Sequence, residues 1–302
     1  MTNTWNSKIL ITGGDGFIAK SLNEFLEIQM PSYDIHLCNR QTLDLLDSKK
    51  VEEYLKKHKF DVIIHTATYD AAPSFSTKDS HKVLNNNLAM FFNLTRCSDS
   101  FGKMLYFGTG AEFGRENWID NMGEDYFDKY VPIDWPYGFS KYIMTKHSLL
   151  SDNIYNFRIF GLFGEYDDWR YRVIPNACCK AVFDLPITIK KNVLFDCIYI
   201  DDLSELVKWF IDNDVKHKTY NICRGESYQY KDLAEIVKKI SRKDLEIIVE
   251  DEDLNIVCGG DNSRLLSEAK DFKFEPIEIS IQKIYSWCLI NKDKIDVNKM
   301  CY

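Results

Sequence analysis

The sequence predicts an α/β fold in which helices cover both faces of a doubly wound parallel sheet, with a smaller, interleaved α/β lobe toward the C-terminus. Two observations support this fold class. A short apolar run at 9–11 breaks into closely spaced glycines and is followed by an amphipathic segment at 20–27, as a buried strand, a tight turn and a helix would be. Strand-like and helix-like segments then alternate up to about residue 165, which is typical of parallel sheets.

The other predicted elements follow from this alternation in chain order. We expect strands at 35–38, 61–65, 103–107 and 154–160, and helices at 48–59, 80–100 and 137–150. Further on, we expect at 198–203 a strand that ends at a helix capped by Asp201 or Asp202, then a strand at 220–222 and helices at 230–241 and 279–290. These elements predict a first lobe at 1–165, rejoined by 193–222, and a second lobe formed by 166–192 and 223–302.

Composition sets the broad class of the protein. The 302 residues carry a formal net charge of −8, with 45% hydrophobic and 28% charged residues, which fits a globular chain and argues against a general nucleic-acid binder. Nine cysteines without a CxxC spacing predict reduced, mostly buried thiols, and we expect no metal site. The sequence shows no basic-then-apolar leader and no apolar run of ~18 residues. We therefore expect a soluble, cytoplasmic protein without membrane contact.

The glycine turn predicts a dinucleotide-binding site of the Rossmann type. Such a turn directs backbone N–H groups and a helix N-terminus toward a pyrophosphate. Gly13 can take the positive φ of the turn, Gly16 lets the backbone approach the phosphates, and Ala19 is small enough for the helix to lie close to the strand. The alternative is a βα turn of the same composition that binds no ligand.

A second motif, Tyr137-x-x-x-Lys141, pairs a phenol with an ammonium group. Because residues four apart share a helix face, the lysine can favour the phenolate and bring a group with a reference pKa of about 10 closer to neutrality. A second copy, Tyr142-x-x-x-Lys146, is rotated by about 140° and cannot face the same pocket. Pro136 marks a helix start and favours the first copy, which leaves the second as a surface or interface pair.

The strand predicted at 103–107 runs into a glycine-rich loop that carries Thr109. Ligands of parallel sheets gather beyond the carboxyl ends of the strands, so the Thr109 hydroxyl could hydrogen-bond a substrate oxygen. A threonine alone in a loop is usually a turn residue. Thr109 becomes a catalytic candidate only together with Tyr137 and Lys141.

Taken together, these motifs resemble the extended short-chain dehydrogenase/reductases, and more narrowly the nucleotide-sugar epimerases, dehydratases and reductases. The similar features are Thr-Gly-x-x-Gly-x-x-Ala at 12–19, Thr109 in a strand-end loop, and Pro-Tyr-x-x-x-Lys at 136–141. Segment 62–67 resembles the family's third core strand, Asn87 matches its Asn-Val helix, and 196–202 is similar to its Asp-Phe-Ile-Tyr-Val-Asp-Asp segment. The resemblance spans most of the chain.

The resemblance implies a catalytic set, a cofactor site and a substrate site. The catalytic set would be Thr109, Tyr137 and Lys141. The cofactor-binding residues would be Gly13, Gly16, Phe17, Ile18, Asn39, Arg40, Asp44, Leu45, Thr66, Ala67, Asn87, Tyr137, Lys141 and Phe160. Substrate contacts are expected from Glu112, Phe113, Arg170 and Arg172, with Arg158, Lys190 and Lys191 as further candidates for pairing a diphosphate.

Departures from the family pattern narrow the expected reaction. The dehydratases carry an Asp-Glu pair after the catalytic Ser or Thr, where this chain has Gly110 and Ala111. The bifunctional fucose-synthase branch uses a Cys and a His, which correspond here to Ala111 and Tyr166, and neither is a ready carbon-acid base. Direct hydride transfer remains, either as net reduction or as 4-epimerisation.

The expected cofactor favours net reduction. NAD-preferring relatives end the second strand with an acid that binds the ribose 2′-hydroxyl, whereas this chain reads Leu-Cys-Asn-Arg at 37–40. Arg40 can instead pair with a 2′-phosphate. We therefore expect an NADPH-dependent reductase of a nucleotide-diphosphate 4-keto-(6-deoxy)sugar, with Tyr137 as proton donor. The alternatives are an NAD-dependent nucleotide-sugar 4-epimerase and a catalytically inactive nucleotide-binding regulator.

The resemblance also implies a homodimer. Family members commonly dimerise by packing the helix that contains Asn87 against the YxxxK helix across a two-fold axis. Apolar side chains on these two segments could supply the contact surface, and they are Met90, Phe91, Phe92, Ile143 and Met144.

Overall fold

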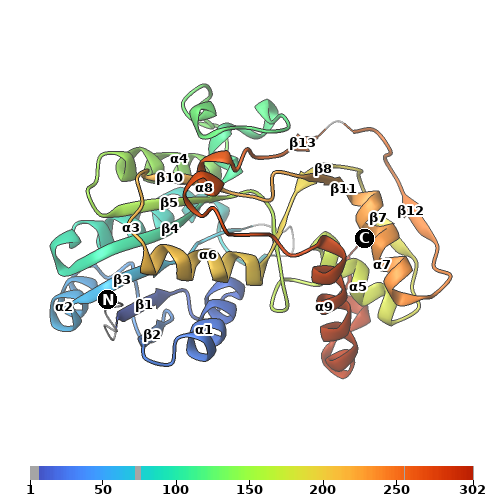
Figure 1. Ribbon diagram of the computed structural model, residues 1–302, viewed down its shortest axis with the longest axis horizontal. Helices are drawn as coiled ribbons and strands as arrows, with labels where there is room; N and C mark the ends of the chain where they lie inside the picture. Colours follow the sequence, from blue (N-terminus) through green and yellow to red (C-terminus); the bar gives the residue numbers. More distant parts are fainter. Residues whose placement is uncertain (1–6, 72–75, 255, 302) are drawn as a thin grey trace. The chain divides into compact units, whose positions relative to one another are not determined.

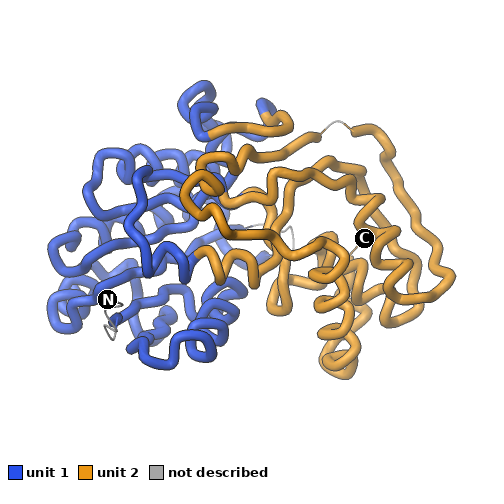
Figure 2. Tube along the Cα trace, viewed as in Figure 1, with its two compact units in different colours: residues 1–117, 124–159, 207–221 blue, residues 118–123, 160–206, 222–302 orange. Residues whose placement is uncertain are grey.

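The computed structural model describes residues 7–71, 76–254 and 256–301. The chain divides into two compact units, which are drawn in different colours in Figure 2. The first unit comprises 1–117, 124–159 and 207–221, and the second comprises 118–123, 160–206 and 222–302. The two units are interleaved in the sequence, and their boundaries differ from those of the predicted lobes at 118–123, 160–165, 193–206 and 222.

The first unit is built on a six-stranded sheet in the order β10-β5-β4-β3-β1-β2. Its strands are β1 (Lys8–Thr12), β2 (Asp34–Cys38), β3 (Phe60–His65), β4 (Phe101–Thr109), β5 (Ile154–Ile159) and β10 (Thr219–Ile222). β1 pairs in parallel with β2 and β3, β3 pairs in parallel with β4, and β4 pairs in parallel with β5. The predicted parallel sheet is confirmed, and the carboxyl ends of β1, β3 and β4 place Thr12, His65 and Thr109 along one edge.

Helices alternate with these strands, as Figure 1 shows: α1 (Phe17–Gln29), α2 (Ser48–His58), α3 (Val83–Thr95) and α4 (Pro136–Leu149). Leu55 of α2, Phe91 of α3 and Met144 of α4 are buried in one core cluster with side chains of the sheet. Side chains of a strand alternate between faces, and Phe157 of β5 packs on Phe210 of α6 (Ile200–Asp212), with 4.3 Å between ring centroids. The doubly wound fold class is therefore confirmed.

Some elements differ locally from the predicted ones. The helix expected at 80–100 is divided, because α3 is flanked by 3₁₀ turns at Ser80–Lys82 and Ser98–Ser100. The prediction that Asp201 or Asp202 caps a helix is wrong. α6 begins at Ile200, directly after the short strand β9 (Ile198–Tyr199), so both aspartates lie inside the first turn of the helix.

The apolar side chains expected at a dimer contact are divided between the core and the surface of the first unit. Phe91 and Met144 are buried in the core, whereas Phe92 is 37% exposed. The homodimer itself stays a prediction.

The second unit contains small sheets in its described residues. β8 (Leu194–Asp196) lies between β11 (Ser227–Gln229) and β13 (Val257–Cys258), β7 (Ile187–Ile189) pairs with β12 (Ile247–Val249), and β6 (Leu162–Phe163) pairs with β9. α5 (Val173–Val182) packs against both α7 (Tyr230–Ser241) and α9 (Ile277–Ile290), and the short helix α8 (Ser263–Glu268) precedes α9 in the sequence. Segment 219–222 joins the large sheet as β10, but 193–200 does not, because β8 and β9 hydrogen-bond to strands of the second unit.

The nine cysteines are free thiols, and all but Cys301 are buried, which matches the prediction of reduced, mostly buried thiols. In the part of the chain that the structure describes, no helix combines the length and apolar character needed to cross a membrane.

Candidate active site

The glycine turn connects β1 to α1 at the carboxyl edge of the sheet. Gly13 has a φ of +77°, and a Cβ at this position would lie 2.9 Å from the backbone of Ala67. A side chain at Gly13 is therefore excluded by both backbone conformation and space. Gly16 is the N-cap of α1, which begins with Phe17 and Ile18 and has no acidic residue in its first turn. This helix N-terminus fits the pyrophosphate of a dinucleotide.

Thr12 fastens the glycine turn to the end of β3. Its hydroxyl lies 2.9 Å from Nδ1 of His65 and accepts the N–H of Ala67 at 3.3 Å, and the Thr66 hydroxyl donates to the Thr12 carbonyl at 2.7 Å. Burial, with a smaller contribution from the nearby Lys141 charge, lowers the pKa of His65 to about 3, so the ring is neutral. Sequence analysis did not pair Thr12 with His65, because they lie on different strands and in separate motifs.

The loop after β2 carries the predicted ribose-binding residues. The Asn39 side chain accepts two backbone N–H groups of its own turn and donates to Asp15 at 3.1 Å. Arg40 is 77% exposed, and its Nε lies 3.6 Å from the carboxylate of Asp44. Leu45 is buried. Asn39 thus shapes the loop, while the guanidinium of Arg40 stays accessible to a ligand.

Asn87 of α3 is buried and connects the loop after β3 to α4. Its Oδ1 accepts the N–H of Tyr69 at 2.7 Å, and its Nδ2 donates to the Tyr69 carbonyl at 3.0 Å and to the Ser140 hydroxyl at 3.4 Å. Ser140 in turn donates to the carbonyl of Tyr137 at 2.7 Å. Asn87 therefore supports both the loop that follows Thr66 and the first turn of α4.

β4 ends at Thr109, where the 3₁₀ turn η3 (Gly110–Phe113) begins. The Thr109 hydroxyl accepts the N–H of Ala111 at 3.3 Å, and the Thr109 N–H donates to Oε1 of Glu112 at 3.0 Å. These reciprocal contacts form a capping box. They fix the partly exposed Thr109 at the carboxyl end of the strand, where the sequence placed a substrate-binding hydroxyl.

α4 brings Lys141 to the same strand end. Lys141 is 5% exposed, and its Nζ donates to the carbonyl of Phe107 at 2.7 Å, two residues before Thr109. The same Nζ lies 6.0 Å from the ring centroid of Tyr137. The structure therefore brings the predicted tyrosine and lysine together beside the end of β4.

The close approach of α4 to η3 depends on a glycine. A Cβ at Gly138 would lie 2.8 Å from the carbonyl oxygen of Ala111, so any larger residue would push the helix away from the turn. Burial lowers the pKa of Lys141 to about 8, and the charges of Glu112 and Asp70 oppose that shift. A buried ammonium beside a phenol favours the phenolate, as an acid–base tyrosine requires.

The second tyrosine–lysine pair lies elsewhere on α4. Tyr142 donates a short hydrogen bond to Asp128, and Lys146 donates to the same carboxylate at 2.5 Å. Lys146 is 48% exposed. The second copy is thus a surface cluster, in agreement with the interpretation of the sequence.

Three predicted ligand-binding residues are instead internal. Glu112 and Arg158 are both fully buried and form an ion pair, with 2.9 Å between Nε and Oε2. Phe113 is 1% exposed, and the guanidinium of Arg158 lies 4.5 Å from its ring centroid. These side chains are bound to one another beneath the strand end, which corrects the expectation that they contact substrate. Sequence analysis could not pair Glu112 with Arg158, because they lie on separate elements.

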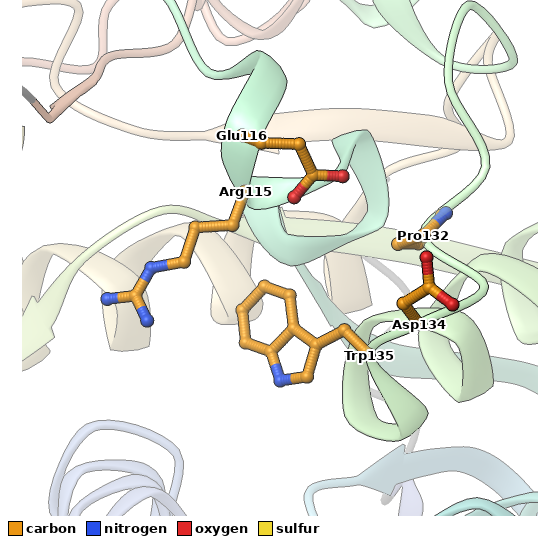
Figure 3. A pocket seen from close by; sticks show the side chains of 5 residues that line it. All are labelled: Arg115, Glu116, Pro132, Asp134 and Trp135. Carbon is orange, nitrogen blue, oxygen red and sulfur yellow. The ribbon is translucent and has the colours of Figure 1, made fainter.

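A cavity of about 220 Å³ opens beside the first turn of α4. Figure 3 shows its lining: Arg115 and Glu116 lie on one side, and Pro132, Asp134 and Trp135 come from the segment that leads into α4. The rings of Trp135 and Tyr137 are 6.0 Å apart between centroids. The cavity therefore adjoins the predicted catalytic tyrosine. Its walls offer an aromatic surface, two carboxylates and one guanidinium.

Phe160, Arg170 and Arg172 belong to the second unit. Phe160 is buried, and Arg170 forms two hydrogen bonds to Asp168, at 2.8 and 2.5 Å. Arg172 lies 3.8 Å from Asp167. Both arginines thus have carboxylate partners in their own unit, and the ligand roles expected for these three residues stay predictions.

Comparisons with known proteins extend this picture. At the level of the whole chain, a GDP-mannoheptose C4 reductase from Campylobacter jejuni, solved with NADP bound, superposes with a TM-score of 0.79. That match has 21% identity and covers 95% of this chain and 99% of the other, so it shows the fold.

Sequence relatives cover most of the chain. A dTDP-4-dehydro-6-deoxyglucose reductase from Escherichia coli is 30% identical over 269 residues, which are 78% of this chain and 82% of the relative. A GDP-6-deoxy-D-talose 4-dehydrogenase from Aggregatibacter actinomycetemcomitans is 24% identical, over 92% of this chain and 97% of the relative. Residues 9–223 match the model of the NAD dependent epimerase/dehydratase family. The chain therefore belongs to this family of extended short-chain dehydrogenases, NAD(P)-dependent enzymes that modify nucleotide sugars.

Proposed function

We propose that the protein is an NADPH-dependent reductase of the C4 carbonyl in a nucleotide-diphosphate 4-keto-(6-deoxy)sugar. The observation that carries the proposal is the junction of β4 and α4. There Lys141, buried and bonded to the Phe107 carbonyl, lies 6.0 Å from the Tyr137 ring beside Thr109. Reduction of a carbonyl needs a proton donor and a hydrogen-bond donor that reach the same oxygen. Tyr137 would be the proton donor and Thr109 the hydrogen-bond donor.

The glycine turn and the loop after β2 would hold the cofactor. Gly13, Gly16 and the N-terminus of α1 suit its pyrophosphate, as their geometry supports. Arg40 is exposed, and the position before it, where NAD-preferring relatives carry an acid, holds Asn39. Both features suit a 2′-phosphate. Bound NADPH would supply the hydride to the C4 carbon. Net reduction is consistent with this cofactor choice.

The protein residues would handle the proton and the carbonyl oxygen. Tyr137 would donate its phenolic proton to the oxygen as the carbon accepts the hydride, so the ketone becomes a hydroxyl. Lys141 would stabilise the resulting phenolate through its positive charge. Thr109 would hydrogen-bond the same oxygen and orient it. Together these roles account for one proton and one hydride per turnover.

The sugar has a suitable place in the cavity beside Tyr137. The indole of Trp135 offers a flat apolar surface to a sugar ring, while Glu116 and Asp134 can accept hydrogen bonds from its hydroxyls. The reductase from Escherichia coli named above acts on a dTDP-4-dehydro-6-deoxy sugar by its name, which supports the same class of substrate here.

The test combines cofactor identity with one variant. Purified protein is denatured to look for released nucleotide, and native protein is titrated with NADPH and NADH before a panel of nucleotide 4-keto sugars is assayed. We expect an empty protein that prefers NADPH by tenfold or more, or about 1.4 kcal/mol. Stoichiometric NAD in the purified protein, without net turnover, would overturn the proposal in favour of a 4-epimerase.

Tyr137→Phe gives the mechanistic test. We expect kcat to fall by orders of magnitude, with NADPH affinity nearly unchanged, because only the proton donor is lost. Tyr142→Phe is the matched control, since it removes a phenol from the surface cluster on the same helix. Near-wild-type turnover in Tyr137→Phe would sink the assignment of the proton donor.

A further inference from the structure

We propose that Glu112 is a positioning residue, which fixes the backbone of Thr109 at the end of β4 and supplies a buried negative charge to the site. The inference rests on the proposed function, because it assigns Glu112 a task toward Thr109 and Lys141. Glu112 lies in η3, directly after the strand end, and is fully buried.

Every described contact of the Glu112 carboxylate ties η3 to the rest of the first unit. Oε1 accepts the N–H of Thr109 at 3.0 Å, and Oε2 accepts from the Thr145 hydroxyl of α4 at 2.8 Å. Nδ2 of Asn156, on β5, lies 3.4 and 3.3 Å from the two oxygens. One carboxylate therefore joins the end of β4, the YxxxK helix and the neighbouring strand.

Arg158 balances the charge of Glu112 from β5. Its Nε donates to Oε2 at 2.9 Å, and its Nη1 donates to the side chain of Asn221 at 3.0 Å. Both members of the ion pair are fully buried. Such a pair adds little net stability, because desolvation cancels most of the attraction. The ion pair instead holds the Glu112 carboxylate in the position where it accepts the N–H of Thr109.

The strand itself leaves space for this arrangement. A Cβ at Gly108 would lie 2.1 Å from Oε1 of Glu112 and 2.2 Å from Oδ1 of Asn156. The residue before Thr109 must therefore be glycine for the carboxylate to occupy its place. This steric fit is independent of the hydrogen bonds and supports the same assignment.

The charge of Glu112 also acts on Lys141. Burial lowers the pKa of Lys141, and Glu112 is the larger of two negative charges that raise it again; the other is Asp70, after β3. Two further titratable neighbours belong to the described residues: Tyr137 of α4, whose ring centroid lies 6.0 Å from Nζ, and His65 of β3, which is neutral because burial lowers its pKa to about 3. Removing the Glu112 charge should therefore shift the pKa of Lys141 downward.

Two substitutions separate the geometric and electrostatic tasks. Glu112→Gln keeps an oxygen that can accept from Thr109 but loses the charge. Glu112→Asp keeps the charge opposite Arg158 but withdraws the carboxylate by one methylene. Asp128→Asn is the matched control, because it removes a carboxylate that contacts α4 on its exposed side.

The experiment measures the pKa of Lys141 by NMR with ¹³C-labelled lysine, assigned with Lys141→Met, together with kcat as a function of pH. In Glu112→Gln we expect a lower Lys141 pKa and a basic limb of the kcat profile that shifts by the same amount. In Glu112→Asp we expect a tenfold or greater loss of kcat, with the Lys141 pKa and the KM for NADPH nearly unchanged. Asp128→Asn should alter none of these.

The outcomes are distinct. A Lys141 pKa that is unchanged in Glu112→Gln, or full kcat in Glu112→Asp, would overturn the positioning role. If Glu112→Gln does not fold because Arg158 is left unpaired, Glu112→Asp alone decides, since it retains the ion pair. If the wild-type protein turns over no 4-keto sugar, the proposed function fails, whereas the NMR titration of Lys141 still tests the electrostatic part of the inference.

Discussion

Replacement of Arg40 by alanine should weaken NADPH binding and leave NADH binding unchanged. The structure allows the magnitude to be worked out. Arg40 is 77% exposed and contacts Asp44 only at 3.6 Å, so releasing that pair costs at most about 1 kcal/mol. A hydrogen bond between a guanidinium and a phosphate contributes about 1.5–3 kcal/mol. The net loss is therefore about 0.5–3 kcal/mol, or roughly 2- to 150-fold in the Kd of NADPH.

The assay is a fluorescence titration of each variant with NADPH and NADH. The difference between the two cofactors should shrink as salt is added, because the contact is exposed and screened. Lys50→Ala is the matched control: Lys50 is also exposed and lies 3.3 Å from an aspartate, Asp47. If Arg40→Ala binds NADPH as tightly as the wild type does, the guanidinium does not bind the 2′-phosphate and the cofactor preference has another origin.

Three further predictions concern the turn, the site and the surface. Gly13→Ala should reduce the free energy of unfolding by about 1–3 kcal/mol and abolish NADPH binding, because φ at this position is +77° and the new Cβ would lie 2.9 Å from the backbone of Ala67. An unchanged thermal melting curve would contradict this prediction. Lys141 has a pKa of about 8 and loses its positive charge as the pH rises through that value, so kcat should fall above about pH 8. A kcat profile that stays flat well above pH 8 would exclude a role for the Lys141 charge. Trp135→Ala should raise the KM for the sugar substrate at least several-fold with little effect on NADPH binding, and steady-state kinetics with an unchanged KM would remove Trp135 from the sugar site.

Much of the fold could be predicted from local patterns. The apolar strand β1, the glycine turn and α1 are contiguous in the sequence, and β1, β3 and β4 each contain a short apolar run that the sequence reveals directly. The destination of 193–200 could not be predicted in this way. The sequences of β8 and β9 resemble those of core strands. Their pairing, however, is with distant segments such as β11 and β6, and no local pattern in those segments indicates it.

The candidate site was predicted unevenly for the same reason. Tyr137 and Lys141 share one helix, so their spacing alone predicts that they lie together. Glu112 was expected to contact substrate, because the resemblance to the family implied that contact. Its burial depends on Arg158 and Asn156, which reach it from another strand, and on the missing side chain of Gly108. A contact network of this kind is visible only once the strands are placed side by side.

The two YxxxK copies show what the spacing itself does not determine. Both place a lysine one turn after a tyrosine, yet Lys141 is 5% exposed and bonded to the end of β4, whereas Lys146 is 48% exposed and bonded to Asp128. The charge of an exposed ammonium is screened by water and does little to a neighbouring phenol. A buried ammonium interacts strongly with such a phenol, but burial also lowers its own pKa toward neutrality, so an opposing charge such as that of Glu112 is needed to keep it protonated. The motif can therefore work as an acid–base pair only where a strand end buries the lysine and an anion compensates its burial.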